Sequence, residues 1–216
     1  MRSFWPGGRA GERVIAVGIT GSSATGKSTA AQAFARRGYP VFSADAAAHG
    51  LLSSDKRTIA TVRKAFPAAW DGKAIDRAQL GRAVFADARA LAKLESLLHP
   101  RVRAAERAFL RGAKADGARI AVLEIPLLFE TGAERLCDVI VVMTAPRAIQ
   151  NVRLRARGTT AARIKAMRAR QLSDSEKARR ADYIVDSSMP KPKMLRALAE
   201  IVRMIDPPPR KAAVRS

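Results

Sequence analysis

A short segment near the amino terminus carries residue types that can hold a chain of phosphate groups. Residues 21–28 read Gly-Ser-Ser-Ala-Thr-Gly-Lys-Ser and fit the pattern G-x-x-x-x-G-K-[ST] at every fixed position. Glycines allow a tight loop whose backbone N–H groups point inward at the oxygens of a polyphosphate. Lys27 would reach the β- and γ-phosphates, and the Ser28 hydroxyl would ligate Mg²⁺. The segment therefore predicts a site for a nucleoside triphosphate.

The residues on either side of this loop support the same interpretation. Residues 14–19 are apolar and mostly β-branched, as in a buried parallel strand, and residues 28–37 are rich in helix formers and end at Gly38. Strand, loop and helix follow in the required order, so the motif is favoured over an ordinary Gly/Ser turn. The expected contacts with the nucleotide phosphates are Gly21, Ser22, Ala24, Thr25, Gly26, Lys27, Ser28 and Thr29.

Carboxylates follow two other predicted strands. Asp45 comes just after a short strand over 38–42, where it could accept the proton of a hydroxyl that attacks the γ-phosphate. It could instead cap the helix that follows, and the two roles are compatible. Glu124 ends the third strand and could hold Mg²⁺ through water or shape an acceptor pocket, with Leu127 in an apolar wall beyond it. A strand end with a hydrophobic plug is the alternative.

Arginines and histidines offer weaker signals. Arg153 and Arg157 are four residues apart and share a helix face, from which they could stabilise the charge of a transferring phosphoryl group. His49 and His99 have no partners at metal-ligand spacing, so a packing or capping role is favoured for both.

Composition and charge limit the possible partners. The 216 residues are 48% hydrophobic and carry a net charge of +21, which suggests a polyanion such as nucleic acid, a nucleotide or a coenzyme. Residues 147–180 hold eleven Lys and Arg against Asp174 and Glu176, although a solvated helical face explains most of them. Cys137 is the single cysteine, which excludes an internal disulfide and predicts a buried small side chain. No apolar run reaches the ~20 residues of a membrane span, and residues 1–13 lack a secretory pattern, so we expect a disordered leader on a soluble, cytoplasmic protein.

Strands that alternate with helices predict an α/β fold of three layers, with a parallel sheet of about five strands. The expected strands are 14–19, 38–42, 119–125, 138–143 and 182–185. Helices are expected over 45–52, 55–65, 76–84, from 87 onward with a kink or restart at Pro100, 146–180 and 190–205. A nucleotide would bind at the carboxyl ends of the strands, where residues 21–28 and Asp45 both lie.

Taken together, these motifs resemble the dephospho-CoA kinase family over residues 14–205. The resemblance starts with Gly18 to Gly21 and Gly26 to Ser28, and continues with Ala44-Asp45 and His49. Further matching segments are Gly72, Ile75 to Arg77, Leu80, Val84-Phe85, Leu91, Leu94-Glu95, His99-Pro100, Val102, Pro126 to Glu130, Gln150, Arg153, Arg157, Gln171 and Ala181-Asp182.

The resemblance implies a P-loop kinase that uses ATP and Mg²⁺ to phosphorylate the ribose 3′-hydroxyl of dephospho-CoA. Asp45 is then the base, Lys27 and Ser28 act at the phosphates and the metal, and Arg153 and Arg157 belong to a lid. The implied organisation is a core of 14–44, 119–145 and 181–205, acceptor-binding helices over 45–112, a lid over 146–180 and a basic tail over 206–216. The acceptor contacts are Asp45, Arg77, His99, Leu127 and Glu130, with no nucleic-acid or membrane partner.

Three positions depart from the family pattern. Ser43 replaces an acidic residue, Ser187 replaces an Asn that borders the adenine, and Ala24 stands in a loop usually richer in glycine, where it must avoid a positive φ or accept strain. A P-loop kinase for a nucleoside or a shikimate-like acceptor is an alternative. A nucleic-acid-binding P-loop protein is another, although binding of single strands favours stacking aromatics, which make up only 5% of this chain.

Overall fold

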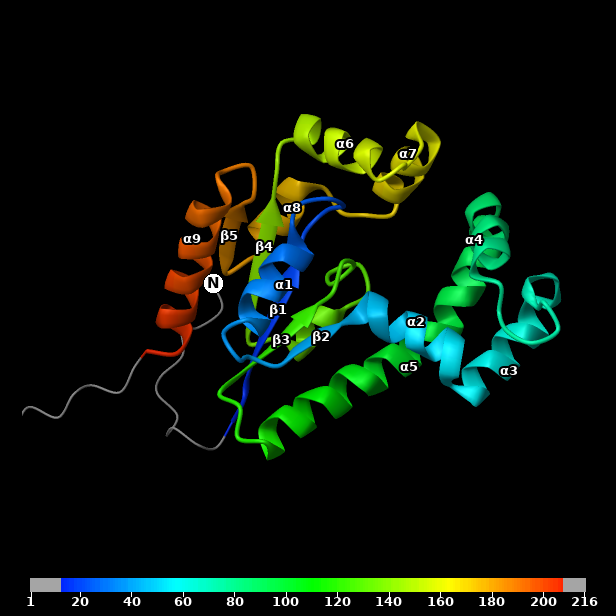
Figure 1. The fold of residues 1–216 in the computed structure, drawn as a ribbon, viewed down its shortest axis with the longest axis horizontal. Coiled ribbons are helices and arrows are strands. Elements are labelled where there is room, and N and C mark those ends of the chain that lie inside the picture. Colours follow the sequence, from blue (N-terminus) through cyan, green and yellow to red (C-terminus); the bar gives the residue numbers. More distant parts are fainter. Residues whose placement is uncertain (1–12, 208–216) are drawn as a thin grey trace, which may run out of the picture.

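Five short strands form one parallel sheet at the centre of the molecule (Figure 1). The computed structural model describes residues 13–207, so most of the predicted leader and tail lie outside the described residues. The strand order is β2-β3-β1-β4-β5, and every neighbouring pair is parallel. The predicted α/β fold with about five parallel strands is confirmed. The strands are β1 (Ile15–Thr20), β2 (Val41–Ser43), β3 (Ile120–Glu124), β4 (Val139–Thr144) and β5 (Tyr183–Asp186).

Successive side chains of each strand point to opposite faces of the sheet, and both faces are covered. Val141 and Met143 of β4 pack in the cluster that contains helices α1 (Lys27–Ala35) and α9 (Lys191–Ile205). Ile140 and Val142, on the other face, pack in a cluster that reaches α5 (Ala88–Ala115). The continuous apolar strands predicted from the sequence therefore reflect burial on both sides.

A lobe of helices stands beside the sheet and has an apolar core of its own (Figure 1). It consists of α2 (Ala44–Ser54), α3 (Lys56–Ala65), the short 3₁₀ helix η1 (Pro67–Ala69), α4 (Arg77–Ala86) and the first half of α5. Leu52, Val62, Leu80 and Leu98 are buried in its core. Pro100 lies inside α5, which continues through it, so the helix does not restart there.

The basic segment between β4 and β5 contains three helices. They are α6 (Arg147–Ala156), α7 (Ala161–Ala169) and α8 (Asp174–Arg179). Gly158, with a φ of 73°, follows the end of α6. The Ser173 hydroxyl accepts a hydrogen bond from the amide of Glu176, whose carboxylate accepts from the Ser173 amide, and this capping box starts α8. The single predicted helical region of 146–180 is therefore divided by a glycine turn and a cap.

Cys137 follows the 3₁₀ helix η2 (Ala133–Leu136) and lies buried beneath the sheet. Its sulfur packs so closely on Gly18 of β1 that a Cβ at that glycine would lie 2.6 Å from Sγ. Burial raises the pKa of the Cys137 thiol to about 12. The predicted role as a buried small side chain is confirmed. Within residues 13–207, none of the helices combines the length and the apolar character that crossing a membrane requires.

Candidate active site

The loop over residues 21–26 has the backbone that the sequence motif predicts. Gly21 has a φ of 142° and Gly26 a φ of 86°, both in the region that favours glycine. A Cβ at Gly21 would also lie 2.2 Å from the carbonyl oxygen of Met143, so no other residue fits. Ala24 has a φ of 62°, and it therefore accepts the left-handed conformation that the sequence left open. Its methyl group is buried against Leu154 and Ile164.

Helix α1 begins at this loop without a side-chain cap. The N-cap residue is Gly26, which has no side chain that could accept a hydrogen bond from the first turn. The amides of that turn are therefore not capped by a side chain and are available to an anion. Lys27 Nζ donates hydrogen bonds to the carbonyl oxygens of Gly21, at 3.0 Å, and Ser22, at 2.8 Å. The loop, the helix terminus and the lysine together concentrate positive potential at the carboxyl end of β1.

Lys27 is buried, and its environment disfavours the charged form. Burial first, and the nearby positive charge of Lys177 second, lower the pKa of the Lys27 ammonium to about 8. The carboxylates of Glu124 and Asp45 act in the opposite direction. Both acids predicted for the site therefore lie within electrostatic reach of the phosphate-loop lysine.

Ser28 and Glu124 form a pair of oxygen ligands beside the loop. The Ser28 hydroxyl donates a hydrogen bond to Glu124 Oε1 at 2.7 Å, and Ser43 of β2 is in register with Glu124. Mg²⁺ prefers oxygen ligands and is usually held by one or two protein groups together with substrate phosphates. In the described residues, no group of three or more His, Cys, Asp or Glu could hold a metal alone. The pair therefore fits a nucleotide-bound Mg²⁺ better than an all-protein metal site.

Asp45 lies in the first turn of α2, and it does not cap that helix. The N-cap is Ser43, whose side chain accepts a hydrogen bond from the amide of Ala46 at 3.4 Å. The interpretation of Asp45 as a capping residue is therefore wrong. Within residues 13–207, Asp45 makes no hydrogen bond or ion pair, so its carboxylate stays available for proton transfer. The Ser that departs from the family pattern is the residue that takes over the cap.

Asp45 lines a hollow between α2, α5 and the loop after β3. Its volume is about 170 Å³, and its walls include the predicted residues His99 and Leu127. Burial lowers the pKa of the His99 imidazole, and the positive charge of Arg103 acts in the same direction. The predicted contacts Arg77 and Glu130 do not line this hollow.

Arg153 connects the phosphate loop to the end of β5. Its guanidinium donates to the carbonyl oxygen of Ala24 at 3.0 Å, to Ser187 Oγ at 2.9 Å and to the carbonyl oxygen of Ser187 at 2.7 Å. Ser187 is buried, and its Cβ would lie 3.1 Å from a Cβ at Gly26. Arg157 is exposed, and its positive charge is among those that lower the pKa of Lys27. Both predicted arginines are thus near the loop, although Arg153 contacts protein oxygens.

Two residues of α8 that the sequence interpretation missed support the site. Asp174 Oδ1 accepts a hydrogen bond from the Ser22 hydroxyl of the phosphate loop, and Oδ2 accepts from Gln150 Nε2 at 2.9 Å. Three residues further on, Lys177 is fully buried. Its Nζ lies 3.0 Å from Glu130 Oε1, in an ion pair that does not have hydrogen-bond geometry. The sequence signalled Asp174 only as one of two acidic residues inside a strongly basic segment, and nothing in it distinguished Lys177 from the other basic residues there.

Comparisons with known proteins agree with this geometry. The family model described as dephospho-CoA kinase matches residues 15–191. A dephospho-CoA kinase of Brucella melitensis is 44% identical over 190 residues, which cover 88% of this chain and 94% of the relative. The relative of that name from Mesorhizobium japonicum is 44% identical over 194 residues, with 89% and 96% covered.

Solved structures give the same result. The crystal structure of TT1252 from Thermus thermophilus aligns with a TM-score of 0.76 at 32% identity, over 89% of this chain and 98% of that one. A dephospho-CoA kinase from Campylobacter jejuni aligns with a TM-score of 0.66 at 27% identity, over 88% and 96%. A shikimate kinase from Acinetobacter baumannii, with a TM-score of 0.51 at 14% identity, shares the fold alone. With a family model that covers most of its length and relatives at this level of identity, the chain belongs to the dephospho-CoA kinase family.

Proposed function

We propose that this protein transfers the γ-phosphoryl group of ATP to the ribose 3′-hydroxyl of dephospho-CoA, the final step of coenzyme A synthesis. The observation that carries the proposal is the position of Asp45. Its carboxylate has no partner among residues 13–207, lines a hollow, and lies within electrostatic reach of Lys27 in the phosphate loop. A hydroxyl bound in the hollow would meet a base on one side and a phosphoryl donor on the other.

On this proposal the phosphate loop and Lys27 hold the β- and γ-phosphates of ATP. Ser28 and Glu124 would hold Mg²⁺, which neutralises the charge that develops on the phosphates when it is bound. Asp45 accepts the proton of the attacking hydroxyl. Ser43 orients Asp45 by fixing the first turn of α2. We place the reaction in the cytoplasm.

The acceptor would bind in the hollow between α2 and α5, with His99 and Leu127 in contact. The helical lobe then serves as the acceptor-binding part, and the α6–α8 segment as the lid. Arg153 holds the nucleotide loop against Ser187, and Arg157 supplies positive charge near the γ-phosphate. Glu130 supports the acceptor wall through its ion pair with Lys177. Arg77 begins α4 at the edge of the lobe, where it would reach only a long acceptor.

A coupled assay of ADP release tests the proposal. We expect turnover with dephospho-CoA and ATP that requires Mg²⁺, and a product with one added phosphate at the 3′ position by mass spectrometry and nuclease digestion. A panel with a nucleoside, shikimate and water as acceptors is the control. Phosphorylation of the nucleoside or of shikimate, with dephospho-CoA left unmodified, would overturn the assignment.

A further inference from the structure

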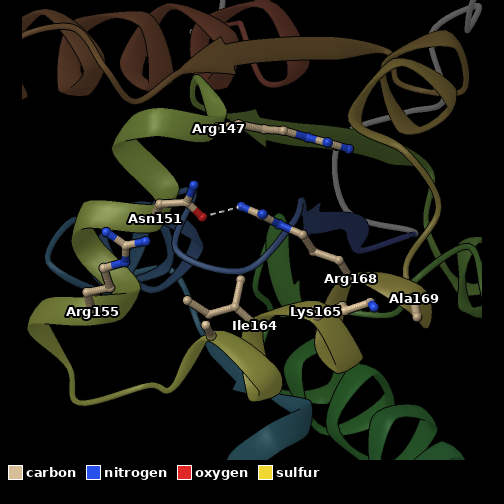
Figure 2. Close-up of a pocket in the computed structure, with 8 residues that line it drawn as sticks. Arg147, Asn151, Arg155, Ile164, Lys165, Arg168 and Ala169 are labelled. Atoms are coloured by element: carbon tan, nitrogen blue, oxygen red, sulfur yellow. Dashed lines mark hydrogen bonds between the residues drawn. The ribbon is translucent and has the colours of Figure 1, made fainter.

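A basic hollow lies between α6 and α7, outside the proposed active site (Figure 2). Its volume is about 540 Å³, within the size range of sites for small molecules. Helix α6 contributes the side chains at positions i, i+4 and i+8, and α7 completes the wall. No acidic residue lines it, and the residues that matter are Arg147, Asn151, Arg155, Ile164, Lys165 and Arg168.

Three of the cationic side chains at this hollow are exposed donors that have no acceptor among the described residues. Within residues 13–207, the side chains of Arg147, Arg155 and Lys165 make no ion pair or hydrogen bond. Arg168 donates to Asn151 Oδ1 at 2.7 Å, as the dashed line in Figure 2 shows. This bond occupies the acceptor of Asn151 and leaves the N–H groups of its amide. These donors therefore suit a ligand that offers hydrogen-bond acceptors and negative charge.

The hollow is separate from the phosphate loop and still connected to it. Helical periodicity places Arg153, which contacts Ala24 and Ser187, on the side of α6 opposite Asn151 and Arg155. The floor is Ile164, which is buried against Ala24 of the loop. An anion that bridges α6 and α7 would restrain the two helices on which Ala24 packs.

We propose that this hollow binds a small anion that carries two or more phosphate groups, as a second phosphate site of the protein. Four cationic side chains around one hollow match the charge of such a ligand. A guanidinium group can also donate two parallel hydrogen bonds to two oxygens of one phosphate. The proposal concerns binding and does not depend on the acceptor of the kinase reaction.

Isothermal titration with inorganic pyrophosphate tests the proposal. Lys27→Ala protein is used throughout, because we expect that change to weaken binding at the phosphate loop. In this background Arg155→Gln/Lys165→Gln should lower pyrophosphate affinity by about tenfold or more. The control, Lys191→Gln/Lys193→Gln, removes two exposed charges from the start of α9 and should leave the affinity unchanged. If both double variants weaken pyrophosphate binding equally, the binding depends on net charge alone, and the proposal of a site between α6 and α7 is overturned.

Hydrogen exchange gives a second measurement on the same Lys27→Ala protein with its basic hollow intact. Pyrophosphate should slow exchange in peptides of α6 and α7 and leave α9 unchanged. Loss of all pyrophosphate binding in the Lys27→Ala protein, with no change of exchange in these helices, would show that the phosphate loop is the site of binding and would overturn the proposal.

Discussion

Lys27 keeps its ammonium group in surroundings that oppose its charge. Its pKa of about 8 means that the folded protein holds the charged form below that pH and loses it as the pH rises further. We expect the KM for ATP to rise between about pH 7 and about pH 9, because the free enzyme loses a charge that binds phosphate. Lys27→Arg, whose guanidinium stays protonated, should show a flatter profile. Initial rates at saturating acceptor give the KM for ATP of the wild type and of Lys27→Arg at each pH. The same rise of KM with pH in both proteins would assign the titration to another group.

Asp45, the proposed general base, lines the hollow and has no hydrogen bond or ion pair within residues 13–207. Asp45→Asn should lower kcat by roughly 10²–10⁴-fold, because the amide cannot accept the proton. ATP binding, followed by titration, should change little. Asp116→Asn, an exposed acid at the end of α5, is the matched control for the lost charge. Near-normal turnover of Asp45→Asn would remove Asp45 from this role.

The sequence predicts local chemistry at the residue scale better than contacts between distant residues. Gly21, Lys27 and Ser28 lie within eight consecutive positions, so their spacing alone indicates a phosphate site. The bond between Ser22 and Asp174 joins residues 152 positions apart, and no local pattern indicates it. Asp45 was an alternative candidate for the cap of α2 for a related reason, because Ser43 and Asp45 are both good capping residues and only the backbone distinguishes them.

At the scale of elements, α8 contacts two separate segments near the candidate site. Asp174 contacts the phosphate loop, and Lys177 forms an ion pair with Glu130 in the segment that follows β3. Asp174→Asn and Ser22→Ala should each raise the KM for ATP several-fold, because either change frees the loop. The KM for ATP of the double variant should be little higher than that of either single variant. This corresponds to a coupling free energy of about 0.5–3 kcal/mol between the two residues.

This double-mutant cycle separates positioning from general destabilisation. The KM for dephospho-CoA should stay near its wild-type value in all three variants, and the melting temperatures correct for lost stability. Additive effects of the two changes, or equal effects on both KM values, would contradict a specific contact between Asp174 and Ser22.

Helices and strands were predictable wherever the apolar periodicity and the glycine or proline residues that end an element agreed. Gly38 closes α1, and Pro67 follows α3, as expected from their backbone restrictions. Pro100 shows the limit of such signals. It sits within α5, where packing of Leu94 and Leu98 in the lobe holds the helix together across the proline. The division of 146–180 into three helices needed the capping residue Ser173 to be recognised.

At the scale of the whole molecule, the separate apolar core of the lobe predicts that the lobe and the sheet unfold as two units. Leu80 is buried in the lobe and Leu198 in the cluster on the sheet, and each should cost about 2–5 kcal/mol when replaced by alanine. Leu80→Ala should speed hydrogen exchange in α2 to α4. Leu198→Ala should speed exchange in β4 and β5 and leave the lobe unchanged, because the lobe opens without the sheet. Equal loss of protection in the lobe for both variants would show that the two cores unfold together.

The parallel α/β architecture could be inferred from alternation of element types, because helical crossovers require parallel strands. The order β2-β3-β1-β4-β5 did not follow from these patterns, since pairing depends on contacts between residues far apart in the chain. The separate core of the lobe was equally hidden, because its apolar residues have the same helical spacing as those of any helix that covers a sheet.

Cys137 gives the chain a practical property. The sequence has one cysteine, and its thiol is buried with a pKa of about 12, so maleimide dyes at neutral pH will leave the native protein unlabelled. A pair of cysteines introduced at exposed positions of α4 and α7 would then carry fluorophores without removal of the native residue. Energy transfer between the two dyes would follow, in single molecules, how the distance between α4 and α7 changes as nucleotide is added.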